Sequence, residues 1–196
     1  MQDAGEDDGA DVTSQKVVAR ASLLAARAER LPEPHEDVDR ATALLDVPEV
    51  VEADTVAAYV SIVGEPGTAI LLDRLRAAGK RVLLPVVLAD RDLEFREYDG
   101  ALVTGRLGMP CPPPAAAQVP LREAAVVVVP ALACDRDGHR LGRGGGSYDR
   151  ALPRAAPEAL TIALIHPEEL WSSVPVDPHD QPVRAVLAGT RFVRVR

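Results

Sequence analysis

Aromatic side chains are scarce in this sequence. Phenylalanine, tyrosine and tryptophan together make up 3% of the 196 residues, whereas hydrophobic residues as a whole make up 47%. A core must therefore be built mostly from valine, leucine, isoleucine and alanine. A domain of this length buries roughly 70% of the surface that its unfolded chain exposes, and the apolar fraction is sufficient for that. Length and composition together favour one α/β domain.

Long apolar runs are also missing. The longest, AAVVVVPALAC, is interrupted by Pro130 and falls short of the ~18–20 residues that a membrane helix needs. We therefore expect a buried strand there and no membrane partner. Cysteine is limited to Cys111 and Cys134, whose positions fit no metal or redox spacing. Two free thiols in a reducing compartment are the expected state, and the predicted location is cytoplasmic.

The balance of charge is acidic. The formal net charge is -8, and five acidic residues precede the first basic residue, Lys16. Nucleic-acid binding depends on neutralising phosphates, so we expect no nucleic-acid partner. The acidic start has low hydrophobicity and high charge, unlike a signal or transit peptide. We predict a disordered acidic tail over residues 1–13 and a single domain over residues 14–196.

Two helices are expected after the tail. Ser14 suits the N-cap of the first. Apolar residues then recur at steps of three and four through Val17, Leu24 and Leu31, which is typical of an amphipathic helix. Residues 34–45 are predicted to form the second helix.

Strand and helix signals then alternate. Residues 55–61 favour a strand, residues 70–78 a helix and residues 81–87 a strand, which together make a right-handed βαβ unit. Fully apolar runs at 126–129 and 160–165 are typical of central strands in a parallel sheet. The other expected elements are a strand at 93–98, a helix at 146–155 and one or two strands in 183–195. The pattern predicts a single-domain α/β fold with an open, mostly parallel sheet and helices on both faces, a Rossmann-like, three-layer architecture.

The segment richest in chemistry lies between a buried strand and the helix that follows it. It carries three consecutive glycines, 144–146, together with Arg140, Arg143 and Asp149. Glycines let backbone N–H groups approach an anion, and guanidinium groups suit phosphate or carboxylate. The segment therefore predicts an anion-binding loop, with a flexible surface loop as the alternative. It is not a Walker A loop, and Ser147 occupies the third glycine position of the dinucleotide fingerprint.

These residues resemble a known family. The run from Pro130 to Asp135, then Gly138, then the run from Arg140 to Arg150 is similar to the signature of 5-formyltetrahydrofolate cyclo-ligases. The resemblance extends from about Lys16 to Arg184. Three further segments carry it: Lys16 and Arg20 four residues apart, with Ala19 where the family has leucine; Glu65 after a strand; and Val174 to Asp180.

The resemblance implies a ligase that forms a carbon–nitrogen bond in folate one-carbon metabolism. ATP and 5-formyltetrahydrofolate would give 5,10-methenyltetrahydrofolate, ADP and phosphate, by way of phosphorylation of the formyl oxygen. ATP is the implied co-substrate and Mg²⁺ the implied metal. We expect a monomer that acts on these small molecules. Positioning and charge stabilisation would do the catalytic work, as in other phosphoryl transfers.

The resemblance also implies roles for individual residues. ATP is expected at Lys16, Arg20, Arg140, Gly142, Arg143, Gly144, Gly145, Gly146, Ser147 and Tyr148. The folate is expected at Val60, Glu65, Arg143, Gly144, Gly145, Gly146 and Ser147. Arg143 and Tyr148 would be catalytic, beside the γ-phosphate and the formyl group. Asp149 and Asp180 would hold Mg²⁺, which prefers hard oxygen ligands.

Several positions depart from the family's pattern, and two alternatives remain open. The departures are Cys111, Ala125, Ala131, Cys134, Gly145 and Ser147, and they bear on folate packing. One alternative is an enzyme like a sugar-phosphate isomerase or CoA-transferase, which can share the architecture and an anion loop. The basic pair on the first helix distinguishes this alternative from a cyclo-ligase, because a polyphosphate needs the pair and a sugar monophosphate would not. The other alternative is a non-catalytic folate- or nucleotide-binding module, which would consume no ATP.

Overall fold

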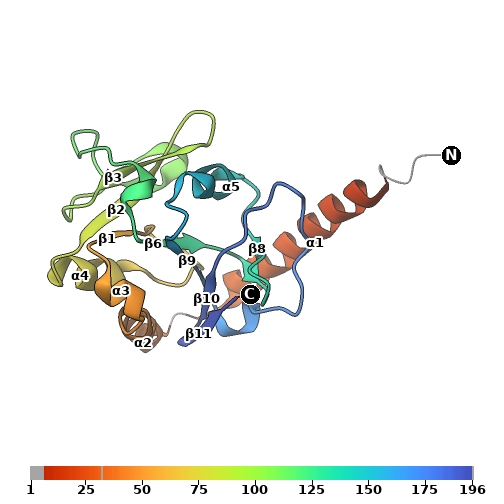
Figure 1. The fold of residues 1–196 in the computed structure, drawn as a ribbon. Coiled ribbons are helices and arrows are strands. Elements are labelled where there is room, and N and C mark those ends of the chain that lie inside the picture. The colour runs from red at the N-terminus through yellow and green to blue at the C-terminus, as the bar shows by residue number, and fades with distance from the viewer. Residues whose placement is uncertain (1–6, 32, 196) are drawn as a thin grey trace.

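A seven-stranded sheet forms the centre of the protein. The computed structural model describes residues 7–31 and 33–195. The strand order is β11-β10-β9-β6-β1-β2-β3 (Figure 1). The strands are β1 (Thr55–Ala57), β2 (Arg81–Val87), β3 (Leu93–Glu97), β6 (Val126–Pro130), β9 (Leu160–Ile165), β10 (Ala185–Ala188) and β11 (Arg191–Arg194). The inner strands pair in parallel, and β3 and β11 pair antiparallel at the edges. The predicted open, mostly parallel sheet is confirmed.

The central strand β6 shows how the sheet is buried. Val126 and Val128 belong to the apolar cluster on one face, and Val127 and Val129 belong to the cluster on the other. Successive side chains of a strand point to opposite faces. A strand that is apolar at every position is therefore covered on both sides, as the sequence predicted.

Helices cover the two faces unequally. One face is covered by α2 (Pro34–Leu45), α3 (Pro48–Glu52) and α4 (Ala69–Ala77), whose buried residues Leu44, Val50 and Leu75 join the cluster with β1 and β2. The other face is covered by α5 (Ser147–Ala151) and by the 3₁₀ turns η2 (Leu121–Glu123) and η3 (Leu152–Arg154). The helix predicted at 146–155 is thus a short α-helix that continues as a 3₁₀ turn.

Helix α1 (Asp7–Glu29) begins earlier than predicted. It starts at Asp7 rather than after Ser14, so residues 7–13 of the expected tail belong to the helix. Residues 1–6 of that tail lie outside the described residues. Acidic side chains near a helix N-terminus stabilise the helix. The prediction of a disordered tail rested on composition and did not consider this effect.

The face of α1 that meets the rest of the protein is also not the predicted apolar stripe. Val17 is 58% exposed, whereas Lys16, Leu23 and Arg27 are buried. Leu23 packs in a separate apolar cluster with Leu132, among others. The prediction placed Val17 inward, which is wrong, because basic side chains with specific partners occupy the buried face.

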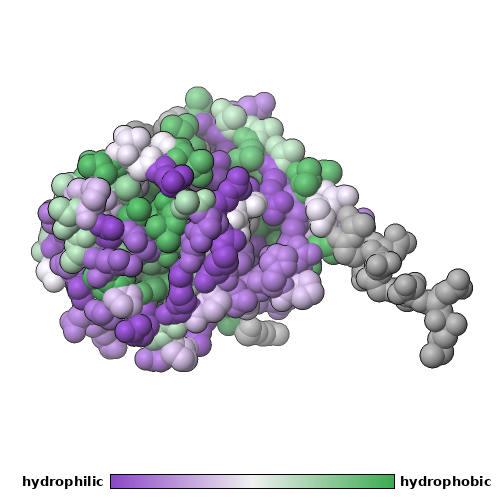
Figure 2. Space-filling model, turned by 90° about the horizontal axis from the view of Figure 1, so that it is seen from above, coloured by the Kyte–Doolittle hydropathy of each residue, from purple (hydrophilic) through white to green (hydrophobic). Residues whose placement is uncertain are grey.

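Two short ribbons connect the sheet to the surface. They pair β4 (Val103–Thr104) with β5 (Pro110–Cys111) and β7 (Ala133–Cys134) with β8 (Arg140–Leu141), and two further 3₁₀ turns are η1 (Arg106–Gly108) and η4 (Pro167–Glu169). The β7–β8 ribbon follows the central strand β6 and leads into the glycine loop. Seen from above, apolar surface lies between polar side chains (Figure 2). Loop residues such as Val63 and Leu107 contribute apolar surface.

Candidate active site

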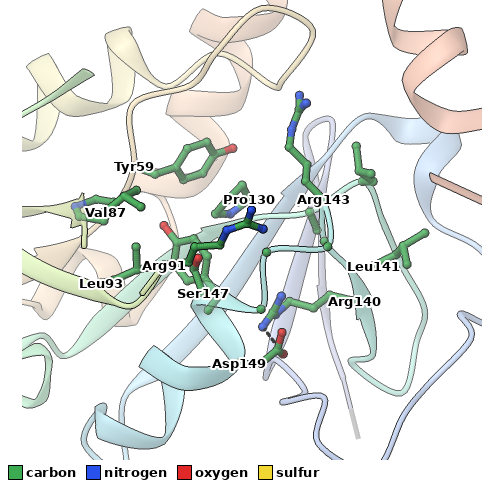
Figure 3. A pocket seen from close by; sticks show the side chains of 18 of the residues that line it. Tyr59, Val87, Arg91, Leu93, Pro130, Arg140, Leu141, Arg143, Ser147 and Asp149 are labelled. Atoms are coloured by element: carbon green, nitrogen blue, oxygen red, sulfur yellow. Dashed lines mark hydrogen bonds and ion pairs between the residues drawn. The ribbon is translucent and has the colours of Figure 1, made fainter. Parts of the chain in front are cut away.

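A cavity of about 450 Å³ lies beyond the carboxyl ends of β1 and β6 (Figure 3). Its walls come from α1, the loop after β1, the β2–β3 turn, the segment from β8 into α5, and residues 177–180. Ligands of open α/β sheets bind outside the carboxyl ends of the strands. The site residues predicted from the sequence all line this cavity: Lys16, Arg20, Val60, Glu65, Arg140, Gly142, Arg143, Gly144, Gly145, Gly146, Ser147, Tyr148, Asp149 and Asp180.

The cavity has an apolar side and a charged side. Val87 at the end of β2 and Leu93 at the start of β3 lie on one side, and Arg140 and Asp149 lie on the other (Figure 3). Such a site suits a ligand that combines a flat apolar ring system with an anionic group. This division matches the two expected ligands, a folate and a polyphosphate.

The glycine loop is held in a defined shape. Gly144 and Gly146 have φ values of 94° and 65°, a region that favours glycine. A Cβ atom on Gly146 would come within 2.9 Å of a guanidinium nitrogen of Arg150. The same guanidinium donates to the carbonyl oxygens of Gly145 and Arg91, at 3.1 and 2.8 Å. These contacts fix the loop, which argues against the alternative of a flexible surface loop.

Arg140 is paired with Asp149 at the start of α5. Arg140 Nη2 donates to Asp149 Oδ1 at 2.7 Å, and the backbone N–H of Gln181 donates to the same oxygen at 3.1 Å. The Arg140 guanidinium also lies over the ring of Tyr148, 6.0 Å from its centroid. Arg140 Nε is buried and has no hydrogen-bond partner among the described residues. It therefore remains available to a ligand.

The two basic residues of α1 reach the cavity through different partners. Lys16 Nζ donates to Asp177 Oδ2 at 2.6 Å and also to Asp180. Arg20 Nε donates to the carbonyl oxygen of Gly142 at 2.9 Å. The Arg20 guanidinium lies against Gly144, since a Cβ there would be 3.5 Å from its Cζ. Helix α1 thus brings one cation to the glycine loop and another to the Asp177 and Asp180 carboxylates.

Asp180 belongs to a small group of metal-ligating side chains. The ligand atoms of Asp177, His179 and Asp180 lie within 4.8 Å of one another. Partial burial acts to raise the pKa of Asp180. The hydrogen bonds from the Lys16 ammonium and from the backbone N–H of Asp177 outweigh that effect, so this pKa lies below its ordinary value. Asp149 is not one of these three residues; its Oδ1 accepts from Arg140 and from the backbone N–H of Gln181, the residue after Asp180.

Glu65 faces the glycine loop from the loop after β1. Its Oε1 accepts a hydrogen bond from Arg143 Nε at 3.1 Å, and its Oε2 accepts one from the backbone N–H of Ile62 at 3.1 Å. The Glu65 side chain is 6% exposed, whereas that of Arg143 is 40% exposed. A carboxylate oxygen can accept more than one hydrogen bond, so Glu65 keeps acceptor capacity for a ligand.

Sequence reasoning missed Arg27, which also lines the cavity. Arg27 donates to both carboxylate oxygens of Glu169, at 2.6 and 2.7 Å, and to the carbonyl oxygen of Ala131 at 2.6 Å. Glu169 in turn accepts from the backbone N–H of His166. Arg27 lies seven residues after Arg20, two helical turns away on the same face, and that spacing could have indicated it.

Tyr59 was missed as well. It lies two residues after the end of β1, lines the cavity, and is 4% exposed. Its position after a buried strand was the only signal in the sequence. His166, by contrast, is buried and does not line the cavity. Burial lowers its pKa, and its ring contacts the carbonyl oxygen of Gly64.

Among the described residues, no helix combines the length and apolar character needed to cross a membrane. Cys111 and Cys134 are both buried and free. Burial raises the pKa of the Cys134 thiol, which makes it a poor nucleophile. The cavity chemistry is therefore that of cations, carboxylates and hydroxyls.

Known proteins match the chain along most of its length. The model of the 5-formyltetrahydrofolate cyclo-ligase family matches residues 12–189. The chain is 43% identical over 150 residues to the 5-formyltetrahydrofolate cyclo-ligase of Mycolicibacterium smegmatis, covering 73% of this chain and 77% of that protein. It is 35% identical over 168 residues to that of Escherichia coli K12, covering 82% and 92%.

Solved structures agree with the fold. The NMR structure of Aquifex aeolicus 5,10-methenyltetrahydrofolate synthetase superposes with a TM-score of 0.82 at 25% identity, covering 92% of this chain and 93% of that one. The signature residues, the cavity that gathers them and the length of these matches agree with one another. The chain belongs to the 5-formyltetrahydrofolate cyclo-ligase family, a family of ligases.

Proposed function

We propose that this chain converts ATP and 5-formyltetrahydrofolate into 5,10-methenyltetrahydrofolate, ADP and phosphate. The observation that carries the proposal is a convergence in one cavity. Cations from α1, the glycine loop and two acids from the second half of the chain face an apolar wall there. A polyphosphate suits the charged side, and a folate ring suits the apolar side.

The proposed reaction overcomes the poor reactivity of a formamide. Its carbonyl carbon is a weak electrophile, and its oxygen leaves badly. Transfer of the γ-phosphoryl group to the formyl oxygen releases ADP and turns that oxygen into a good leaving group. The N10 amine of the same folate then forms the new bond to the formyl carbon and loses its proton to solvent, and phosphate departs with the formyl oxygen. No nucleophile from the protein is needed.

Three cations are proposed to hold the triphosphate. Arg20 reaches the glycine loop from α1, Lys16 of the same helix lies beside Asp177 and Asp180, and Arg140 lies on β8 with its buried Nε unpaired among the described residues. Guanidinium forks suit phosphate oxygens. The backbone N–H groups of residues 142–147 would complete the cradle. In this arrangement the protein stabilises charge that moves during phosphoryl transfer.

Magnesium is the proposed metal, held by Asp149 and Asp180. The donor set fits, because Mg²⁺ binds through one or two carboxylates together with phosphate oxygens and water. Asp177 adds a third carboxylate beside Asp180. When bound, the ion would supply positive charge that neutralises phosphate oxygens. The Lys16 ammonium contacts the same carboxylates, so a divalent cation at Asp180 would compete with it.

Arg143 and Tyr148 are proposed to lie nearest the reacting atoms. Arg143 extends into the cavity from the glycine loop (Figure 3). Burial, followed by the nearby Glu65 carboxylate, raises the pKa of Tyr148, so its hydroxyl stays neutral and can donate a hydrogen bond. Val60 and Glu65 would contact the folate, with the carboxylate accepting from the ring's N–H groups.

A turnover assay tests the proposal. Protein, Mg-ATP and 5-formyltetrahydrofolate are mixed, and the absorbance band of the methenyl product is followed. We expect product to accumulate together with an equal amount of ADP, and none to form when ATP is omitted. Tight folate binding without ATP consumption would instead identify a non-catalytic binding module. Neither that module nor a sugar-phosphate enzyme is favoured by any observation in the cavity.

We also propose that the chain acts in the cytoplasm as a monomer. The free, buried cysteines support a reducing compartment, where disulfides are rare. The residues that the resemblance assigns to ATP, folate and Mg²⁺ all line one cavity of a single chain, which supports the monomer. Light scattering at micromolar concentration tests the monomer, and a mass near twice 20.8 kDa would contradict it.

A further inference from the structure

The hydroxyl of Tyr59 is a buried polar atom with no hydrogen-bond partner among the described residues. Tyr59 lines the cavity, and its ring extends from the end of β1 toward the cavity interior (Figure 3). Buried polar atoms are nearly always paired, and leaving one unpaired is costly. The unpaired Tyr59 hydroxyl is explained if a bound ligand supplies its hydrogen-bond partner.

The backbone around Tyr59 is held rigidly. Thr68 Oγ1 donates to the carbonyl oxygen of Tyr59 at 2.7 Å and accepts from the backbone N–H of Ser61 at 2.9 Å. The N–H of Thr68 donates to Ser61 Oγ at 3.0 Å. Thr68 is fully buried, and it stands before α4 without capping that helix through its side chain. Its hydroxyl instead fixes the segment that carries Tyr59.

The electrostatic surroundings make the hydroxyl a donor. Burial, followed by the nearby carboxylate of Glu65, raises the pKa of Tyr59 well above its ordinary value. Glu65 acts on Tyr148 in the same direction. Two neutral hydroxyls and one carboxylate therefore lie near one another in the cavity.

We propose that Tyr59 is a substrate-binding residue that donates a hydrogen bond to the ring carbonyl of the pterin. A reduced pterin presents an amino group, a ring N–H and a carbonyl oxygen along one edge. A carboxylate accepts from the first two groups, and a neutral hydroxyl beside it donates to the third. Glu65 and Tyr59 form such a pair. The inference rests on the proposed function, because it takes the folate as the ligand.

The Tyr59→Phe variant removes the hydroxyl and keeps the ring. Its affinity for 5-formyltetrahydrofolate, measured by calorimetry without ATP, is expected to fall about tenfold, the effect of one buried hydrogen bond. Affinity for ADP should stay within about twofold, which shows that the fold is intact. Tyr98→Phe is the matched control. Tyr98 lies beneath the Arg76 guanidinium and does not line the cavity, so folate affinity should be unchanged.

A second measurement follows folate binding in the wild-type protein and uses variants only to assign the signals. The chain has three tyrosines, so protein labelled with fluorotyrosine gives three ¹⁹F resonances, assigned by the single phenylalanine variants. Added 5-formyltetrahydrofolate should shift the Tyr59 and Tyr148 resonances and leave that of Tyr98 in place.

Two outcomes would overturn the inference. They are unchanged folate affinity in Tyr59→Phe, and a Tyr59 resonance that does not respond to the folate. Failure of the wild-type protein to bind the folate at all would be a different result, because it would remove the proposed function itself.

Discussion

Helices α1 and α2 lie next to each other in the sequence, yet they join the protein by different means. The buried face of α2 is mostly apolar, with Ala41 and Leu44 packed in the core cluster beside the sheet, and its buried Arg40 pairs with Glu36 and Asp37 of the same helix. The buried face of α1 carries Lys16, Leu23 and Arg27. Hydrophobic burial is not directional, whereas each buried cation needs its own partner at the right position. The first kind of contact builds the fold, and the second builds the cavity.

The largest expected effect comes from breaking the buried ion pair of α1. In Arg27→Ala, the Glu169 carboxylate stays buried without its cation, which should lower the free energy of unfolding by about 3–5 kcal/mol. Urea unfolding, followed by the fluorescence of the sole tryptophan, Trp171, measures this. Trp171 packs against the cluster that contains Leu23, so its emission reports on this region.

A double variant separates charge from packing. Arg27→Met with Glu169→Gln removes both charges and keeps an acceptor for the N–H of His166. It should recover part of the stability that Arg27→Ala loses. If Arg27→Ala costs less than about 1 kcal/mol, the pair contributes no more than a surface ion pair, and the contrast between α1 and α2 disappears.

The next largest expected effect is a loss of activity when a charge is removed from the charged side of the cavity. In Asp149→Asn the amide oxygen can still accept from Arg140 and Gln181, but the negative charge is lost. We expect kcat/KM to fall about a hundredfold, equivalent to about 2.7 kcal/mol, with little change in unfolding. Turnover is measured over a range of Mg²⁺ concentrations.

Asp137→Asn is the control for that substitution. Asp137 is exposed in the same part of the chain and does not line the cavity, so activity should be unchanged. Wild-type turnover in Asp149→Asn would remove Asp149 from the site.

The contrast between apolar packing and ion pairing also explains which parts of the structure could be predicted from the sequence. The apolar strand β6 and the helix α2 were predicted closely, because period and apolar content depend on local residues. The 55–61 strand was predicted too long, since Thr68 binds the backbone of Tyr59 and Ser61 in place of a neighbouring strand. Arg27 and Glu169 are 142 residues apart, and no local pattern reports such a pair.

The site residues were predicted from the resemblance to the cyclo-ligase family and not from the periodicity of apolar residues. The residues from Arg140 to Asp149 form a contiguous signature, so the family could be found in one segment. The neighbours that complete the cavity lie on other elements. Asp177 beside Lys16 and Tyr59 beside Glu65 became visible only when the strands were assembled.

A third experiment tests which face of α1 is buried. Leu23→Ala should cost about 2–3 kcal/mol of unfolding free energy, since a buried leucine is truncated. Val17→Ala, on the exposed face, should change it by less than about 0.5 kcal/mol. Both are read from urea unfolding curves. Equal effects at the two positions would contradict the orientation of the helix.

The smallest expected effect is at the junction of the two helices. Glu36 at the start of α2 accepts a hydrogen bond from Arg30, just beyond α1, at 2.6 Å. Partial burial acts to raise the pKa of Glu36, but the bond and charge of Arg30, with Arg40, outweigh it and hold this pKa below its ordinary value. A carboxyl group of this kind stabilises the fold above its unfolded pKa, and the contribution is lost as the pH falls through the lower, folded value.

Glu36→Gln should therefore be less stable than wild type at neutral pH and should approach it in acid. The two side chains are about a quarter exposed, at 24% and 26%, and reached by solvent, so the difference should be no more than about 0.5 kcal/mol, and salt should reduce it. Unfolding curves across the acid range, with and without added salt, measure it. A difference that persists in acid would mean that Glu36 contributes through shape rather than charge. The junction would then resemble the apolar contacts of α2 more than the ion pairs of α1.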